Sequence, residues 1–550
     1  MERWDTIVVG SGAGGLTAAL ALARAGQRVL VLEQHYLPGG WTHSFALEGY
    51  RFSPGVHYIG ELGPGQSARA LYEGLGLGSD LTFHELAPDG FDHFLLGGER
   101  FDVPRGFDRY FERLVSRFPH ERKGLARYFD VIGRIVEGTL RCEELLVSPR
   151  GALELPFRSK DLFVWGLRTQ HALLDSTIRD PLLRGILAAQ SGNHGLPPSR
   201  VSLPLHARMI NHYYDGGYYP RGGAKRIPMA MIKALRRRGG EIRLRTRVRR
   251  ILVESGRAAG VELESGERIA SRAVVSNADP AITFGKLLEP PHGERERRKT
   301  GRMEYSVGIL SVFCATDLDL PAMGLDSGNY WCYRTLDVNG VYERALHALP
   351  HGIIEGLFLT VTTLKDPGHA PKGHHTLELF TFVPYEPFER WAGTAAARPE
   401  GYRDLKERLG DALIAAAERV IPGLGKNLTF RSVGTPLTND FYCETHRGSS
   451  YGTAKSPLQL GPFSFPIRSS VPGLYSVGAS TLSHGVAGAA TSGLFAARDI
   501  LGVRHIADLL APPDGSLQIV PAAELAPASR TRVHAPAAAH DDDTEDALAS

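Results

Sequence analysis

The segment that most constrains the fold runs from Thr6 to Glu33. Residues 6–9 form a short apolar run that ends at Gly10, residues 16–25 are rich in Ala and Leu, and residues 29–32 form a second apolar run. A strand, turn, helix and strand in this order, with both strands apolar throughout, is typical of a βαβ unit in a buried parallel sheet. We therefore expect an α/β protein.

The turn of this unit carries the pattern G-x-G-x-x-G through Gly10, Gly12 and Gly15. The first glycine permits the tight bend, the second lets the backbone approach a pyrophosphate, and the third allows close packing of helix on strand. Glu33 ends the second strand, where its carboxylate can accept hydrogen bonds from an unphosphorylated ribose. A glycine-rich structural turn is the alternative, but the strand–helix context and Glu33 favour a dinucleotide site.

The length and charge of the chain point to several domains and an unusual end. The 550 residues carry 63 basic and 60 acidic side chains, a net charge of +3. From Gly502 onward there are 3 basic and 8 acidic residues, which gives the tail −5 and leaves +8 for the body. This tail, rich in Ala, Pro and Asp, is expected to be disordered because it has too little apolar surface to bury.

Composition also excludes several classes of protein. Basic residues do not alternate with aromatic ones as a nucleic-acid surface requires, so no nucleic-acid partner is expected. The four cysteines are widely separated, which argues against a metal centre and favours a reducing compartment. Neither a leader nor an apolar run of about 18 residues is found. We expect a cytoplasmic protein, with a mildly basic body that is compatible with peripheral contact with a membrane.

Two further blocks resemble parts of a cofactor-binding domain. Residues 218–223 lead into a predicted helix over about 224–238, followed by strand-like runs to Ser276. Near the end, a short strand precedes Gly478 and a predicted helix that runs from Gly485 to about Leu501. The regions between these blocks mix apolar helices and strands without a chemical motif, and they predict an inserted domain.

Together these motifs identify a family resemblance. The carrying segments are Gly10 to Gly15, Glu33-Gln34-His35 with Gly39-Gly40, Gly55-Val56-His57-Tyr58-Ile59-Gly60, Ser276 to Pro280, Gly448 to Gly452 and Gly473 to Gly493. The chain resembles, over about residues 4–503, the phytoene desaturase, carotenoid isomerase and retinol saturase group of FAD-dependent oxidoreductases. It is most similar to the retinol saturase-like branch.

The resemblance implies a domain plan. Residues 1–100, 205–290 and 430–503 would form a Rossmann-type FAD-binding domain of the glutathione-reductase and amine-oxidase type. Residues 100–205 and 290–430 would form an α+β substrate domain inserted into it, and residues 504–550 the disordered acidic tail.

The resemblance also implies which residues hold FAD. The glycine turn would hold the pyrophosphate, Glu33 the ribose and Val248 the adenine, while the helix at Gly485 would point its N-terminus at the flavin. Where many flavoproteins have an aspartate that binds the ribityl chain, this sequence has Ala479. The residues assigned to FAD are Gly10, Gly12, Ala13, Gly14, Gly15, Glu33, Gln34, Gly39, Gly40, Val248, Gly478, Ala479, Ser480, Gly485, Val486 and Ala487.

The implied activity acts on carbon–carbon bonds of an apolar isoprenoid, a carotenoid or retinoid, by hydride transfer at flavin N5. Saturation, desaturation and redox-neutral cis–trans isomerisation all remain open, as does the electron donor. His57, His484 and His43 are candidate proton carriers, and Arg221 could touch the flavin or a substrate carboxylate; a buried histidine or a plain salt bridge is the alternative for each.

Several wider questions also stay open. Tyr213, Tyr214, Tyr218 and Tyr219 could line an apolar tunnel, although aromatic residues at this density are more often core. An amine-oxidase-like flavoenzyme and a non-catalytic lipid-binding protein, like the escort proteins of prenylated small GTPases, are the alternative functions. No metal is expected, and the sequence does not set the oligomeric state.

Overall fold

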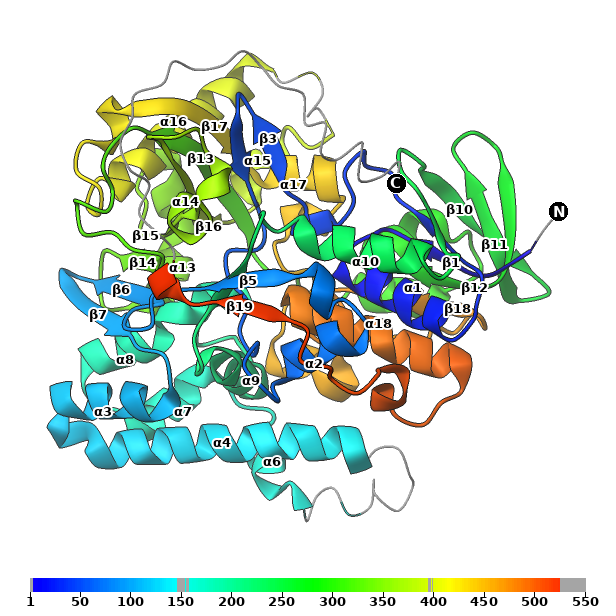
Figure 1. Cartoon of the computed structure of the whole chain (residues 1–550), viewed down its shortest axis with the longest axis horizontal. Helices are drawn as coiled ribbons and strands as arrows, with labels where there is room; N and C mark the ends of the chain where they lie inside the picture. The colour runs from blue at the N-terminus through cyan, green and yellow to red at the C-terminus, as the bar shows by residue number, and fades with distance from the viewer. Residues whose placement is uncertain (1–2, 146–153, 155–157, 394–396, 398, 525–550) are drawn as a thin grey trace.

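The first of two large sheets carries the βαβ unit. The computed structural model describes residues 3–145, 154, 158–393, 397 and 399–524 (Figure 1). The strand order is β10-β11-β12-β1-β2-β9, with β18 also paired to β12. The pairs β1–β2, β1–β12, β2–β9 and β12–β18 are parallel. The bounds are β1 Trp4–Val9, β2 Val29–Leu32, β9 Glu241–Arg243, β10 Val248–Glu254, β11 Arg257–Leu263, β12 Arg268–Ser276 and β18 Leu474–Ser476.

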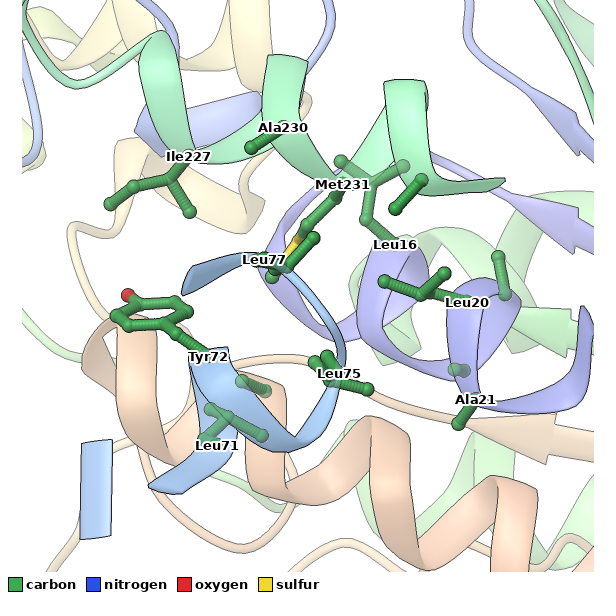
Figure 2. Close-up of a cluster of buried hydrophobic side chains, with 14 of the residues drawn as sticks. Leu16, Leu20, Ala21, Leu71, Tyr72, Leu75, Leu77, Ile227, Ala230 and Met231 are labelled. Carbon is green, nitrogen blue, oxygen red and sulfur yellow. The ribbon is translucent and has the colours of Figure 1, made fainter. Parts of the chain in front are cut away.

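Helices cover this sheet because the chain alternates buried strands with helices that are apolar on their inner side. These helices are α1 Ala13–Arg24, α2 Ser67–Gly74, α10 Arg226–Arg236 and α18 Gly485–Leu501. Figure 2 shows Leu16 and Leu20 of α1 in one cluster with Met231 of α10, Leu71 of α2 and Leu75, which directly follows α2; all of them are buried. Burying one such side chain contributes about 1.5–3 kcal/mol. The α/β fold class and the predicted βαβ unit are confirmed.

The second sheet forms the other half of the molecule. Its order is β17-β13-β16-β15-β14-β6-β7, and within it β14–β6 is a parallel pair while the other pairs are antiparallel. The bounds are β6 Asp92–Leu96, β7 Glu99–Val103, β13 Gly308–Thr316, β14 Asn329–Tyr333, β15 Gly356–Val361, β16 His375–Val383 and β17 Leu428–Gly434. Strands β6 and β7 therefore belong to this sheet, so the boundary predicted at residue 100 is too late: the chain enters the second sheet at Asp92.

Helices surround the second sheet on several sides. Their bounds are α3 Phe107–Arg117, α4 Arg122–Leu145, α6 Lys160–Trp165, α7 Gln170–Thr177, α8 Pro181–Ala188, α9 Leu203–Tyr213, α13 Val338–Ala348, α14 Thr362–Lys365, α15 Glu386–Glu389 and α16 Glu400–Ala417. In Figure 1, α4 and α6 lie along the lower edge of the molecule. The remaining short helices and strands are β3 Phe45–Leu47, β4 Tyr50–Phe52, α11 Pro280–Ile282, α12 Glu294–Thr300 and α17 Pro436–Cys443.

A third, small sheet contains part of the chain that was expected to be disordered. Its order is β19-β5-β8, from β5 Thr82–Glu85, β8 Tyr218–Pro220 and β19 Gln518–Val520. The backbone N–H of Leu517 donates to Glu73 Oε1 at 3.1 Å, and that of Ala511 to the Gly74 carbonyl at 2.9 Å. The prediction of disorder is therefore wrong for residues 504–524; the rest of the predicted tail, residues 525–550, lies outside the described residues.

Candidate functional site

A pocket opens at the carboxyl ends of β1 and β2, where parallel α/β sheets bind ligands. It encloses about 800 Å³ of space that is not filled by protein atoms, part of it open to solvent. Its lining residues are Val9, Gly10, Ser11, Gly12, Leu32, Glu33, Gln34, His35, Leu37, Gly40, His43, Thr246, Val248, Asn277, Ala278, Ile282, Leu287, Tyr442, Cys443 and Glu444. We call it the cofactor pocket. Six of the residues predicted to bind the cofactor, namely Gly10, Gly12, Glu33, Gln34, Gly40 and Val248, are among them.

The glycine turn is as crowded as its motif predicts. Gly10 has φ +92°. A Cβ at Gly15 would lie 2.2 Å from the Gly10 carbonyl oxygen, and a Cβ at Gly12 would lie 2.5 Å from Asn277 Nδ2. Gly12 is the N-cap residue of α1 and has no side chain to cap it. The first turn of the helix can therefore offer N–H groups to an anion in the pocket.

Asn277 supports this turn from the end of β12. Its Oδ1 accepts a hydrogen bond from the Gly15 N–H at 3.0 Å. A Cβ at Gly14 would lie 2.8 Å from the same oxygen. The sequence marked Asn277 only as part of a family segment, and the structure shows its task, which is to fix the start of α1.

Glu33 is held in place by hydrogen bonds from the protein itself. Its Oε2 accepts from the backbone N–H of Ser11 at 2.8 Å and from the Ser11 hydroxyl at 2.6 Å, and its Oε1 accepts from the His35 N–H at 2.9 Å. The Ser11 hydroxyl also accepts from the Gly39 N–H at 3.0 Å. One hydrogen-bonded cluster therefore links the glycine turn, the end of β2 and the Gly39-Gly40 loop. Glu33, which is 8% exposed, lines the wall of the cofactor pocket.

One wall of the pocket comes from a segment that carries no motif. Tyr442 and Cys443 at the end of α17, and Glu444 directly after it, line the pocket together with Thr246 and Val248. Glu444 adopts φ +45° and forms an ion pair with Arg247, next to Thr246. Sequence reasoning missed this wall because these three residues are far from the glycine turn in the chain and form no recognisable pattern.

The N-terminus of α18 is open to a ligand. Gly485 is exposed, Val486 and Ala487 are half-buried, and His484, the N-cap residue, does not cap the helix with its side chain. Further along, a Cβ at Gly493 would lie 2.2 Å from the Gly14 carbonyl oxygen. The α18 helix is therefore locked directly onto the glycine turn.

The short segment before α18 is tied to its neighbours. The Gly478 N–H donates to Ser492 Oγ at 2.8 Å, and Ala479 is half-buried. Ser480 Oγ donates to Asp279 Oδ2 at 2.9 Å and accepts from the Thr453 N–H at 3.1 Å. A cofactor contact of Ser480 would thus come from its backbone.

His57 lies against a buried carboxylate. Its Nδ1 is 2.9 Å from Glu378 Oε2, and the carboxylate's other oxygen accepts from the Ser53 N–H at 2.6 Å. Lys365, at the end of α14, donates from Nζ to the His57 carbonyl oxygen at 2.7 Å and to Asn329 Oδ1 at 2.5 Å. Burial lowers the pKa of Lys365 to about 7, while Glu378, Asp92 and Asp326 oppose that shift.

A chain of hydrogen bonds continues from Lys365 to His484. Asn329 Nδ2 donates to Asp92 Oδ1 at 3.0 Å, and the Tyr58 hydroxyl donates to Asp92 Oδ2 at 3.1 Å. Asn193 Nδ2 donates to the Tyr58 oxygen at 2.9 Å, and the Asn193 carbonyl accepts from His484 Nε2 at 2.6 Å. Burial raises the pKa of Asp92 to about 6. The two predicted histidines are thus ends of one buried polar network, which local sequence patterns could not show.

The remaining candidate catalytic residues differ in their position and surroundings. His484 is neutral at physiological pH, because burial lowers its pKa to about 4. His43 lines the cofactor pocket and donates from Nδ1 to the Gly40 carbonyl at 2.6 Å; burial lowers its pKa to about 4 as well. Arg221 is exposed on the turn after β8, and the structure does not bring it to the cofactor pocket.

The four tyrosines that could have lined an apolar tunnel pack mainly inside the protein. Tyr218 and Tyr219 are 2% and 1% exposed and donate to the Asp215 carbonyl and Ser53 Oγ. Tyr213 stacks on Tyr58 with ring centroids 4.3 Å apart, and Tyr214 packs edge-on against Phe107. The core alternative therefore describes all four, because their rings pack against other aromatic side chains or lie fully inside the protein.

A second, aromatic pocket lies on the second sheet. Its lining residues are Trp331, Tyr333, Val341, Tyr342, Gly356, Leu357, Phe358, Thr381 and Phe382. The ring centroids of Trp331 and Phe358 are 4.6 Å apart, and Tyr342 stacks on Phe382 at 6.0 Å. A Cβ at Gly192 would lie 2.3 Å from Trp331 and 2.7 Å from Phe382, so the segment that ends in Asn193 packs on this pocket. We call it the aromatic pocket.

Tyr451 lies between the aromatic pocket and the N-terminus of α18. The ring centroids of Tyr451 and His484 are 4.7 Å apart. Tyr451 is also close enough to Tyr342 for the two phenols to interact electrostatically. A Cβ at Gly195 would lie 2.8 Å from the Tyr451 ring. Residues 192–195 thus connect the aromatic lining with the helix start beside the cofactor-binding domain.

Comparisons with known proteins agree with this arrangement. The model of the family described as "Flavin containing amine oxidoreductase" matches residues 13–501. The chain belongs to that family. The FAD-dependent oxidoreductase expected from the sequence is confirmed, with FAD as cofactor.

Two relatives align with most of the length of this flavoenzyme. All-trans-retinol 13,14-reductase of Macaca fascicularis is 30% identical over 92% of this chain and 87% of its own. Prolycopene isomerase 1, chloroplastic, of an Oncidium hybrid cultivar is 29% identical over 92% of this chain and 86% of its own. The predicted resemblance to the retinol saturase and carotenoid isomerase group is confirmed. Cyclohexylamine oxidase from Brevibacterium oxydans has the same fold, with a TM-score of 0.58, 18% identity and coverage of 91% of this chain and 99% of its own.

The residues present fit FAD. The side-chain-free glycine turn, the fixed carboxylate of Glu33 and the open start of α18 provide sites for a pyrophosphate, a ribose and an electron-rich ring edge. When bound, flavin supplies two-electron chemistry at carbon atoms. Among the described residues, no cluster of three His, Cys, Asp or Glu side chains forms a candidate metal site.

Proposed function

We propose that this flavoenzyme acts on a carbon–carbon double bond of an apolar polyene of the retinoid or carotenoid class. The observation that carries the proposal is the aromatic pocket, whose Tyr342 lies near Tyr451, which in turn contacts His484 at the start of α18. Its walls are aromatic and aliphatic, as a conjugated hydrocarbon requires. The retinol reductase and prolycopene isomerase relatives support the same substrate class.

In this proposal, the chain's own residues orient the polyene, keep water out and hold a proton. Trp331 and Phe358 offer flat faces along the pocket. His57 is the proton holder, because its Nδ1 faces Glu378 while its ring contacts Phe358 and Phe380 at centroid distances of 5.1 and 5.2 Å. His484 is neutral and fixes the position of Asn193. We assign Gly14, Gly15, Gly478 and Gly485 to the cofactor as well, with Ala13, Gly39, Ala479, Ser480, Val486 and Ala487.

Two alternatives have weaker support. An amine substrate is suggested by the solved structures of putrescine oxidase and cyclohexylamine oxidase, which are 17% and 18% identical to this chain and therefore bear on the fold alone. A lipid-binding protein without catalysis would have no reason to keep Glu33 hydrogen-bonded at the wall of an intact cofactor pocket.

The test is an anaerobic assay of protein reconstituted with FAD. All-trans-retinol and a poly-cis carotene are each incubated with the reduced and the oxidised enzyme, and the products are separated by chromatography and identified by mass spectrometry. A gain of two hydrogens indicates saturation, a loss indicates desaturation, and an unchanged mass with a new retention time indicates isomerisation. Peroxide formation from amines, with no conversion of either polyene, would contradict the proposal.

We also propose that the lower edge of the molecule in Figure 1 contacts a membrane. Four large apolar side chains in this region are between 45% and 61% exposed. They are Leu140 on α4, Phe163 and Val164 on α6, and Leu167, which follows α6. Basic residues Arg141, Lys160 and Arg168 accompany them, but Glu137 and Asp161 lie on the same two helices, so the apolar side chains would supply most of the attraction to the membrane. Such a contact would let an insoluble polyene enter from the bilayer.

Vesicle sedimentation tests this surface. Replacing Phe163 and Leu167 by Ser should reduce binding to vesicles with anionic lipid while leaving flavin content unchanged.

Among the described residues, no helix combines the length and apolar composition needed to cross a membrane. Among the described residues, no pair of cysteines forms a disulfide bond, which fits the cytoplasmic location proposed for this protein.

A further inference from the structure

The polar side chains of the aromatic pocket differ in whether they have a hydrogen-bond partner within the protein. Three of its side chains satisfy their hydrogen-bonding atoms within the protein. Trp331 Nε1 donates to Asp92 Oδ1 at 3.2 Å, the Tyr333 hydroxyl donates to the Ala189 carbonyl at 2.5 Å, and Thr381 Oγ1 donates to the Gly356 carbonyl at 2.6 Å. These groups hold the pocket in shape and have little left for a ligand.

Tyr342 differs from them. It reaches the pocket from α13, and its ring stacks on Phe382 with an angle of 22° between the planes. Its hydroxyl oxygen is withdrawn from solvent and has no hydrogen-bond partner among the described residues. A buried hydroxyl without a partner loses its bonds to water and gains nothing in return, which is costly in a protein interior.

A pure hydrocarbon would not relieve this cost, because it offers neither donor nor acceptor. An oxygen atom on the ligand would relieve it, because a phenol both donates and accepts. A site that provides one polar atom in an apolar pocket discriminates between ligands that differ in one hydroxyl.

We propose that Tyr342 binds an oxygen-bearing end group of the polyene, so that the enzyme prefers hydroxylated or otherwise oxygenated isoprenoids to hydrocarbon carotenes. This proposal rests on the proposed function, since it places the substrate in the aromatic pocket. It adds the recognising atom, the Tyr342 hydroxyl, and narrows the substrate class.

The experiment compares two ligands and two variants of the FAD-loaded full chain. The ligands are all-trans-retinol and its deoxy analogue, which has the same polyene and no hydroxyl. The variants are Tyr342→Phe and, as the matched control, Tyr333→Phe, which removes the same atom from the same pocket at a position where the hydroxyl already has a partner. Binding is measured by titration of the polyene absorbance, and turnover by product formation.

For Tyr342→Phe we expect retinol to bind about 3- to 10-fold more weakly, with kcat/KM lowered by the same factor, while the deoxy analogue is unchanged. Tyr333→Phe should affect both ligands equally, and its melting temperature should fall, whereas that of Tyr342→Phe should not. Equal effects of Tyr342→Phe on both ligands, or none on either, would overturn the assignment. If the wild-type enzyme binds both ligands but converts neither, the proposed function fails while the binding comparison still decides the role of Tyr342.

Discussion

The contact between α1 and α18 allows a prediction about cofactor binding. A Cβ at Gly493 would lie 2.2 Å from the Gly14 carbonyl oxygen, 2.9 Å from the Ala18 nitrogen and 3.1 Å from Thr17 Cβ. A close carbon–oxygen contact is about 3.3 Å, so Gly493→Ala must separate the two helices by about 1 Å. Helix α1 begins at the cofactor pocket, and the proposal above assigns the start of α18 to the cofactor as well, so this separation would displace the two sites against each other.

The expected cost of this overpacking is about 1–3 kcal/mol of unfolding free energy. If FAD requires the close approach, the same energy weakens its binding about 5- to 150-fold. Flavin fluorescence measures the dissociation constant after the protein has been stripped of FAD, and thermal unfolding with and without added FAD measures stability.

Gly133→Ala is the matched control, because Gly133 is exposed within α4 and a Cβ there meets nothing within 4 Å. Removing a helical glycine should leave stability equal or raise it by up to about 1 kcal/mol, with FAD binding unchanged. A Gly493→Ala variant that folds and binds FAD with the wild-type dissociation constant would refute the argument that this contact sets the cofactor site.

Three further changes test other parts of the site. Glu33→Gln keeps the shape but loses the charge that accepts the Ser11 and His35 hydrogen bonds, and flavin fluorescence should show FAD binding weakened by about tenfold; unchanged binding would exclude a cofactor role. Asn277→Leu frees the Gly15 N–H and crowds the glycine turn, so flavin content after purification should fall, and full flavin content would contradict the role given to Asn277. Lys365 loses its proton near pH 7 in the folded protein and near 10.5 when unfolded, so the unfolded chain binds more protons between these values and stability should rise with pH by up to about 1.4 kcal/mol per unit. Chemical denaturation of Lys365→Met at several pH values should show that this rise is lost, and an unchanged slope would mean that Lys365 is not the group responsible.

The sequence predicted the parts of the site that local chemistry determines. The turn from Gly10 to Gly15 and the carboxylate of Glu33 were predictable because backbone shape and phosphate binding require those residue types at that spacing. The helix from Gly485 to Leu501 was predictable for another local reason, since its Ala-rich apolar run is followed by Gly502, and a glycine just after such a run is a typical helix end.

The parts that depend on distant pairing were not predictable. Strand β6 joins the second sheet through β14, which comes much later in the chain, and β5 pairs with β19, which lies near the end of the described residues. Lys365 stands in a polar stretch that looks like a surface turn, yet it is fully buried because Glu378 and Asp92 come near it from other strands. Neither fact leaves a periodic or local signal in the sequence.

The position of the locking glycine in the chain has a consequence for biosynthesis. Gly493 and the start of α18 are among the last parts of the described chain to be made, whereas the glycine turn that they lock is among the first. At about 5–20 residues per second, roughly 25–100 seconds separate the two on the ribosome. During that interval the nascent chain has the turn without the helix that secures it. FAD should therefore be captured stably only when synthesis is almost complete, and chains that end before α18 should emerge without flavin.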